Sequence, residues 1–199
     1  MGRYLALELA STIRHDGDGG VADDLESVPG ARRWLREQEE LLPDGVDEGT
    51  LVVDEGLREE VVGLRQAVRA LFAQAVYPAP ASSADAHGLI TVDQAVARLN
   101  AGAAEEPVVP RLAWHDEAPP EAQLLPAAGR DARSRLTAAL ARAAIDFLTG
   151  PERERLRACA APRCVRYFVK RHGRQEWCKP SCGNRARVAR HYRRQREAP

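Results

Sequence analysis

The cysteines constrain this chain of 199 residues more than any other feature. All four lie in the last quarter of the sequence as two close pairs, which residues 165–177 separate. A close pair can hold one metal ion from two sides, and a separation of this length lets a short hairpin bring the second pair back to the same ion. We therefore predict one structural zinc ion with four thiolate ligands: Cys159, Cys164, Cys178 and Cys182.

Four cysteines also permit other chemistry. Two disulfides would satisfy the count in an oxidising compartment, whereas the reducing cytoplasm favours thiolate ligation. We expect a cytoplasmic protein, because the sequence has no apolar run of about 18 residues that would span a membrane and its first residues lack the apolar stretch of a signal peptide. Four thiolates also hold iron-sulfur clusters, so this alternative to zinc stays open. A catalytic zinc ion is not expected, since it leaves one coordination position to water.

The charge of the chain is divided between its two parts. Basic and acidic residues cancel over the whole sequence, with 29 of each. From Pro151 onward there are 15 Lys and Arg against four Asp and Glu, a net charge of +11, which leaves 14 against 25, or −11, for residues 1–150. A basic segment of this kind attracts phosphate, while an acidic companion can shield it in the free protein.

We predict an α+β fold in two domains. Residues 1–150 form a mostly helical domain with a short β-hairpin, and residues 151–199 form a small zinc module. The first part is long enough for its own core, and an apolar content that rests on Ala, Val and Leu, with only 5% aromatic residues, favours packed helices. The second part has too few apolar residues to fold without a metal.

Apolar periodicity and capping residues locate the elements of the first domain. We predict helices over residues 4–14, 29–42, 54–77, 91–101 and 131–148. Short extended segments at 108–114 and 122–125 predict a β-hairpin. The stretch 15–20 is predicted to be a polar loop, and 81–88 an exposed linker suited to proteolytic cleavage.

The cysteine module is predicted to contain a hairpin and a helix. Residues 165–170 alternate as in a strand, and a turn at His172-Gly173 would pair them with residues 174–177. A helix then begins at Ser181, as its cap, and runs to about Arg196. Cysteine knuckle, hairpin and ligand-bearing helix together make a treble-clef-like module.

The last helix is predicted to have two faces. Val188 and Tyr192 are four residues apart and would pack on the hairpin. Arg187, Arg190 and Arg194 form a stripe on the other side, where arginine can bind backbone phosphate or the edge of guanine in the major groove. This stripe is the predicted nucleic-acid surface.

Two further residues are candidates for the same surface. Asn184 can pair with adenine, and Arg185 can contact phosphate. The structural alternative is equally open: Asn184 would then fix a turn or cap by hydrogen bonds, and Arg185 would lie over the ring of Tyr167 or Trp177.

The sequence from Trp177 to Arg187, with its run Cys182-Gly183-Asn184-Arg185, resembles the CGNR zinc finger, which is named after these four residues. The resemblance extends over residues 156–196. The opening at residues 5–9, followed by residues 11–14, is similar to the ABATE domain that commonly precedes this finger. Together they imply a bacterial transcription regulator, proposed to be stress-induced, with a zinc-dependent DNA-binding end.

We therefore expect a DNA-binding regulator. The alternatives are a zinc-stabilised adaptor, whose arginines meet an acidic protein surface such as its own first domain, and an RNA-binding protein in which aromatic residues of the module stack on bases. An enzyme is not expected, since the chain has no nucleophile elbow, phosphate loop or zinc-protease motif. A homodimer and a small-molecule ligand of residues 1–150 are compatible with the sequence, which identifies neither, and no membrane partner is expected.

Overall fold

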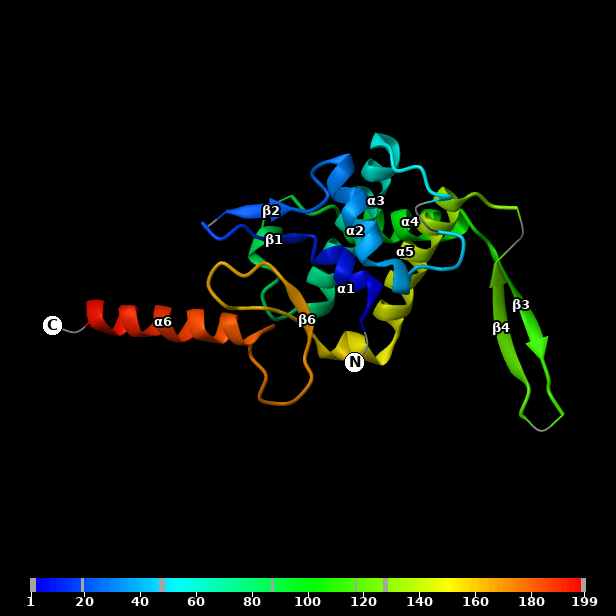
Figure 1. The fold of residues 1–199 in the computed structure, drawn as a ribbon. Helices are drawn as coiled ribbons and strands as arrows, with labels where there is room; N and C mark the ends of the chain where they lie inside the picture. The colour runs from blue at the N-terminus through cyan, green and yellow to red at the C-terminus, as the bar shows by residue number, and fades with distance from the viewer. Residues whose placement is uncertain are drawn as a thin grey trace.

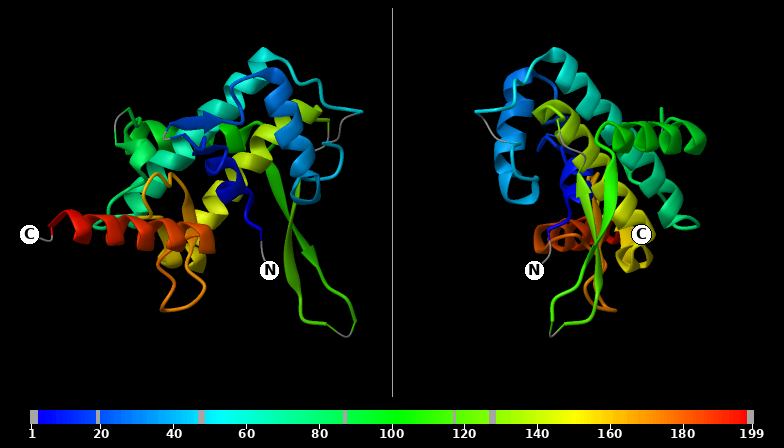
Figure 2. Two further views of the ribbon diagram at one scale, coloured as in Figure 1. Left: turned by 60° about the vertical axis from the view of Figure 1, so that its left-hand side comes forward. Right: turned by 90° about the vertical axis from the view of Figure 1, so that its right-hand side faces the viewer.

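The chain folds into a mostly helical body from which two segments project (Figure 1). The computed structural model describes residues 3–18, 20–46, 49–86, 88–116, 118–126 and 129–197. One projection is the hairpin of β3 (Val108–Ala113) and β4 (Glu121–Pro126), and the other is the final helix α6 (Pro180–Glu197). They extend from opposite ends of the body, as the left view in Figure 2 also shows. The predicted α+β class, with a mostly helical first part, is confirmed.

Helix α3 (Glu55–Val76) is the centre of the body, and α1 (Leu5–Ala10), α4 (Val92–Ala104) and α5 (Ala132–Thr149) pack around it. Its buried apolar residues recur every three or four positions: Leu57, Val61, Leu64, Val68 and Phe72. Burial of each such side chain contributes about 1.5–3 kcal/mol. The predicted helices at 54–77 and 131–148 are confirmed to within two residues. No described helix has the length and the apolar run of a membrane span.

Side-chain caps fix where these helices begin. The carboxylate of Asp54 accepts a hydrogen bond from the backbone N–H of Leu57 at 2.7 Å, and Asp131 does the same for Ser134 at 2.8 Å. At the start of α4, Thr91 and Gln94 form the predicted reciprocal capping box. Each cap satisfies a backbone donor that the first helical turn leaves free.

The predicted helix at 4–14 is too long. Helix α1 ends at Ala10, and β1 (Ile13–His15) pairs antiparallel with β2 (Val21–Asp23). The hydroxyl of Thr12 donates to the carbonyl of Leu9 at 2.8 Å, so the chain leaves the helix there. The polar loop predicted after residue 14 is the turn of this hairpin, where Asp16 accepts hydrogen bonds from two backbone N–H groups. Apolar spacing alone could not distinguish one helix from a helix followed by a strand.

The predicted helix at 29–42 divides in two. Helix α2 (Val28–Glu37) is capped by Ser27, whose hydroxyl accepts from the N–H of Gly30. One 3-10 turn, η1 (Glu39–Leu41), follows it. Both lie at the edge of the body, and Trp34 and Leu35 of α2 are buried against the core.

The predicted hairpin at 108–125 is confirmed as β3 and β4, which pair antiparallel from Val108 with Pro126 to Ala113 with Glu121. Its base is fixed to the body by Glu106, whose side chain is only 2% exposed and accepts a hydrogen bond from Arg142 at 2.7 Å. The hairpin itself is largely exposed to solvent.

The cysteine module does contain a hairpin, but the predicted partner strand is wrong. The strand β6 (Tyr167–Val169) pairs with β5 (Leu156–Ala158), which precedes the first cysteine, and not with residues 174–177. A 3-10 turn, η3 (Pro151–Arg155), joins β5 to α5. Leu156 and Tyr167 are buried in the same core as α3, so the body selects this pairing.

A buried polar network joins the module to the body. Arg69 of α3 pairs with Asp85 at 2.8 Å, and the hydroxyl of Tyr167 donates to Asp85 at 2.6 Å. Ser82 donates to the backbone carbonyl of Val165 at 2.8 Å. Burial, together with the hydrogen bond to Asp85, raises the pKa of Tyr167 and keeps its hydroxyl a donor. We call these four side chains, Arg69, Ser82, Asp85 and Tyr167, the Arg69 network.

This network corrects the expectation of an exposed linker at 81–88: Ser83, Ala86 and Gly88 are exposed, but two residues between them are not. Ser82 and Asp85 are 3% and 9% exposed, and a 3-10 turn, η2 (Ser83–Asp85), lies between α3 and α4. The small polar residues that suggest a linker are here the partners of a buried arginine. Proteolytic cleavage at these buried positions is therefore not expected.

The expected packing of α6 on the hairpin is also wrong. Val188 and Tyr192 are 54% and 62% exposed, and the helix extends into solvent beyond Ala186 (Figure 2). The helix begins at Pro180, so Ser181 lies inside the first turn and is not the cap.

Replacing Tyr167 by Phe tests the Arg69 network. The change removes the donor to Asp85 and the acceptor of the Ser82 N–H, both buried. We expect the free energy of unfolding to fall by about 1–3 kcal/mol, the usual cost of leaving buried polar groups without partners. Urea denaturation measures it. Tyr192→Phe, at an exposed site, should change nothing, and equal stability of both variants would contradict the role given to the network.

Candidate metal centre

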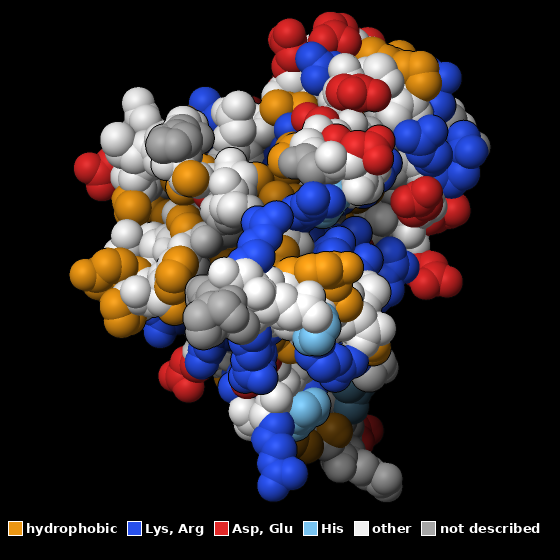
Figure 3. Space-filling model, turned by 90° about the vertical axis from the view of Figure 1, so that its left-hand side faces the viewer, with side chains coloured by type: hydrophobic (Ala, Val, Ile, Leu, Met, Phe, Trp, Pro, Cys, Tyr) orange, Lys and Arg blue, Asp and Glu red, His pale blue; other side chains and the backbone are white. Residues whose placement is uncertain are grey.

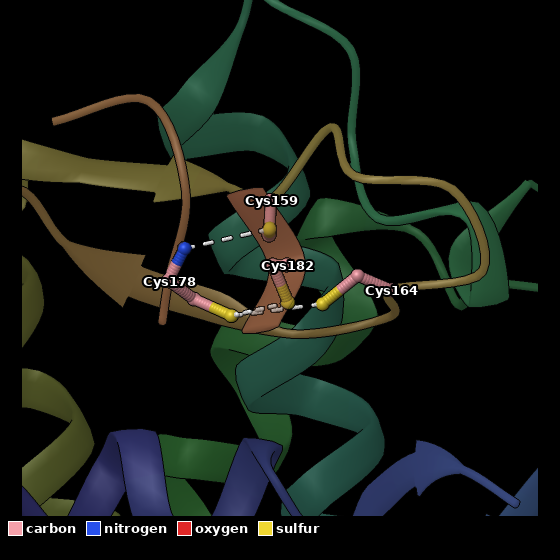
Figure 4. A group of neighbouring side chains, drawn as sticks. All are labelled: Cys159, Cys164, Cys178 and Cys182. Atoms are coloured by element: carbon pink, nitrogen blue, oxygen red, sulfur yellow. Dashed lines mark hydrogen bonds between the residues drawn. The ribbon is translucent and has the colours of Figure 1, made fainter. Parts of the chain in front are cut away.

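The four cysteine side chains converge on one point (Figure 4). Cys159 and Cys164 come from the loop between β5 and β6, Cys178 precedes α6, and Cys182 lies in the first turn of α6. All four sulfur atoms lie within 4.8 Å of one another. In the described part of the chain, no other group of three or more His, Cys, Asp or Glu side chains is close enough to share a metal.

The spacing of the sulfurs fits a tetrahedral metal. The Sγ atoms of Cys164 and Cys178 are 3.7 Å apart, and those of Cys178 and Cys182 are 3.5 Å apart. Zinc with four Zn–S bonds of about 2.3 Å gives sulfur–sulfur distances of roughly 3.8 Å, whereas a disulfide needs about 2.05 Å. None of the four cysteines forms a disulfide. They form a metal site for one zinc ion, as predicted.

Two tight turns aim these sulfurs inward. In the first, the N–H of Cys164 donates to the carbonyl of Ala161 at 3.0 Å, with Pro162 in the second position of the turn and Arg163 at a positive φ of 62°. Proline favours that position. In the second turn, the N–H of Cys182 donates to the carbonyl of Lys179 at 3.0 Å. The turns and not the metal alone orient the ligands.

Four thiolates at this distance repel one another. Hydrogen bonds with Cys164 and Cys178 lower the pKa of Cys159, whereas hydrogen bonds with Cys159 and Cys164 raise the pKa of Cys178. The site therefore favours proton sharing among the sulfurs unless a cation lies between them. Zinc supplies that positive charge, and its binding free energy becomes folding free energy for the module.

Glycine at position 183 allows the ring of Trp177 to cover the cluster. A Cβ atom at Gly183 would lie 2.9 Å from Cδ1 of Trp177. Trp177 also packs with the buried Ala161 and Phe168 around the cysteines. The glycine of the motif is thus explained by packing.

The structure separates the two remaining motif residues. Arg185 is half-buried, and its Nη2 donates to the sulfur of Cys182 at 3.3 Å. Among the described residues it makes no cation–π contact with Tyr167 or Trp177. Cζ of Arg69 instead lies 5.4 Å from the centroid of the Tyr167 ring. Asn184 is exposed, and its side-chain oxygen accepts a hydrogen bond from Arg187.

The predicted arginine stripe is exposed along α6, at Arg187, Arg190 and Arg194. It belongs to a larger group of basic side chains, and Figure 3 shows Lys and Arg gathered on the side from which α6 projects. No described carboxylate lies within 4 Å of the members of this group. We call it the unpaired basic surface: Arg163, Arg166, Arg174, Lys179, Arg187, Arg190, Arg193, Arg194 and Arg196.

Eight arginines of the body differ in this respect, because each pairs with a carboxylate. Arg14 pairs with Asp24 at 2.7 Å, and Arg133 pairs with Glu60 at 2.7 Å. Among the described residues, no ion pair joins α6 to the body. The acidic first domain does not neutralise the basic helix through contacts of this kind.

A groove of about 950 Å³ lies between α1 and the module. Arg166, Arg174 and Lys179 of the unpaired basic surface contribute to its wall, with Glu8 and Trp177. Sequence reasoning did not identify it, because the two walls come from opposite ends of the chain.

A second groove, of about 730 Å³, lies between α2 and the residues 42–46 and 49–53. Its wall is mostly apolar and includes Leu35, Leu51 and Val53, with Arg32 beside them. This volume is in the range of small-molecule sites. No local motif marks these residues, so sequence reasoning did not identify the groove.

The double variant Cys178→Ser with Cys182→Ser should lose the metal. Serine keeps the shape but removes two of the four thiolates, so we expect zinc measured by mass spectrometry to fall from one ion per chain to none. Hydrogen exchange should rise over residues 171–186, while β5 and α3 stay protected because Leu156 and Tyr167 pack in the main core. Retention of one zinc ion would refute the four-thiolate site.

Gly183→Ala should weaken zinc binding, since the added methyl group displaces Trp177 from the cluster. We expect the zinc affinity, measured by competition with a chromogenic chelator, to fall by about tenfold, or about 1.4 kcal/mol. Gly173→Ala is the matched control, because a Cβ at Gly173 meets no atom within 4 Å. Equal affinities of the two variants would show that the contact with Trp177 does not matter.

Comparison with protein families agrees with this geometry. Residues 155–195 match the CGNR zinc finger, and residues 4–151 match ABATE, described as "Putative stress-induced transcription regulator". Neither is an enzyme family. No curated protein matches the chain with significance. The chain therefore belongs to the ABATE family and carries a CGNR zinc finger at its C-terminal end.

Proposed function

We propose that this protein regulates transcription by binding duplex DNA through α6 and the unpaired basic surface around the root of that helix. The observation that carries the proposal is electrostatic. These cations have no described carboxylate within 4 Å, whereas eight arginines of the body each pair with a carboxylate. A cluster of cations without local counter-charges attracts the phosphate backbone and releases the counterions condensed on it.

The shape of α6 supports the same function. Residues 187–197 extend beyond the last buried residue of the helix, Ala186, and would span about 16 Å at 1.5 Å per residue. The major groove of B-DNA is about 12 Å wide and admits a helix of this kind. Arg187, Arg190 and Arg194 lie on one face at helical spacing, where they can reach phosphate or guanine edges.

Two alternatives receive less support. An adaptor that binds its own acidic domain would need contacts between α6 and the body, and the described residues include no ion pair of that type. An RNA reader that stacks bases on Tyr167, Phe168 and Trp177 would need these rings exposed, but Tyr167 and Phe168 are 3% and 8% exposed and Trp177 is half-buried. An adaptor for another acidic protein is an outcome that the experiments below distinguish.

Selection of random duplex DNA on the zinc-loaded protein tests the proposal. We expect a short motif to be enriched and the enrichment to disappear with a chelator. A palindromic motif would indicate a dimer, which a module of this size needs to enlarge its footprint at physiological salt. No enrichment with one zinc ion bound per chain would favour the protein adaptor.

The triple variant Arg187→Ala, Arg190→Ala, Arg194→Ala should bind DNA at least tenfold more weakly. The slope of log affinity against log salt should become shallower by about 1 for each lost phosphate contact. Fluorescence anisotropy with a labelled duplex measures both, and zinc content should not change.

The control has the same change of charge in the first domain: Arg33→Ala, Arg111→Ala, Arg130→Ala, all at exposed arginines. We expect its affinity and salt slope to stay at the values of the unmodified protein. If both triple variants lose affinity equally, net charge and not α6 governs binding, and the proposal is wrong.

A further inference from the structure

Arg185 differs from every other arginine of α6. It follows Cys182 by three residues, so its side chain lies on the same face of the helix as the metal ligand. Its Nη2 is 3.3 Å from the sulfur of Cys182, and the residue is half-buried. Arg187, Arg190 and Arg194 point into solvent instead.

The guanidinium of Arg185 has no acidic partner. No described Asp or Glu oxygen lies within 4 Å of it, and its Nε is buried without a hydrogen-bond acceptor among the described residues. A partly buried cation is unfavourable unless a negative charge compensates it. The environment of Arg185 therefore requires an anion other than a carboxylate.

The cysteine cluster is that anion. Four thiolates around one divalent zinc ion carry a net charge of about −2. Among the described residues, Arg185 is the only Lys or Arg whose side chain donates a hydrogen bond to a cysteine sulfur. One backbone group also donates to the cluster: the N–H of Cys178 lies 3.5 Å from the sulfur of Cys159. The opposite charges thus meet inside the module.

We propose that Arg185 is a positioning residue of the metal centre: its guanidinium balances the charge of the zinc–thiolate cluster and holds the sulfur of Cys182. Arg185, which is the arginine of the CGNR motif, is then not one of the DNA contacts that the sequence predicted. This assignment rests on the metal site and is independent of the proposed DNA binding. Partners that hold a metal ligand in place typically contribute tenfold to a hundredfold to metal affinity.

The test compares three variants of the full-length protein by zinc competition with a chelator. Arg185→Met keeps an unbranched chain without charge, Arg185→Lys keeps the charge with another shape, and Arg187→Met removes a neighbouring exposed charge. We expect zinc affinity to fall tenfold to a hundredfold for Arg185→Met, to recover at least partly for Arg185→Lys, and to stay unchanged for Arg187→Met.

The order of the two Arg185 variants separates charge from packing. If Arg185 only fills space, Met should retain zinc as well as Lys or better, and that order would overturn the proposal. Cobalt provides a second readout, because the sulfur-to-cobalt charge-transfer band reports the electrostatic environment of the thiolates. A band that shifts in Arg185→Met and returns with Lys supports the charge role, and an unmoved band contradicts it.

DNA binding at saturating zinc distinguishes this proposal from the proposed function. We expect Arg185→Met to bind duplex DNA within about twofold of the unmodified protein once loaded, and Arg187→Met to bind more weakly. Normal zinc affinity with lost DNA binding in Arg185→Met would overturn the positioning role and leave the DNA proposal standing. Undiminished DNA binding in Arg187→Met would count against that residue's DNA contact and leave the role of Arg185 untouched.

Discussion

The convergence of four thiolates on one point is the constraint on which the C-terminal module depends. Sulfurs within 4.8 Å of one another need a cation between them, and that requirement joins two loops to the first turn of α6. Because Cys182 fixes the root of the helix and Ala186 is its last buried residue, the rest of α6 has no support from the body. The same anchoring that closes the metal site therefore directs a basic helix into solvent.

Arginine has opposite uses in the two parts of the molecule. In the body, arginines hold elements together: Arg69 connects α3 to Asp85, and Arg142 fixes Glu106 at the base of the projecting hairpin. On α6 no described carboxylate lies within 4 Å of an arginine. Burying an ion pair costs desolvation free energy, which well-aligned hydrogen bonds between the two charges offset. The exposed cations of α6 can instead attract an external anion. Arg185 belongs to the first kind, with thiolates in place of a carboxylate.

The Arg69 network connects the cysteine module to the body through buried hydrogen bonds. Through Tyr167 and Val165 it joins the strand next to the metal site to α3 and to the segment between α3 and α4. Leu156 and Tyr167 add apolar contacts in the main core. A change in the packing of α3 would thus reach β6 through buried, directional bonds, which gives the first domain a physical connection to the metal-binding end of the chain.

The sequence by itself determined the metal ligands and the long capped helices, because both depend on local spacing: Cys159, Cys164, Cys178 and Cys182 need only short loops, and Asp54 or Thr91 acts within one turn. Only the tertiary structure decided which strand pairs with β6, that Ser82 and Asp85 are buried, and that Val188 and Tyr192 are exposed. It also placed Arg185 against a thiolate, apart from the arginine stripe. Except for the contact between Arg185 and Cys182, which are three residues apart, these outcomes depend on contacts between segments far apart in the chain, and periodicity along one segment carries no information about the surface that it meets.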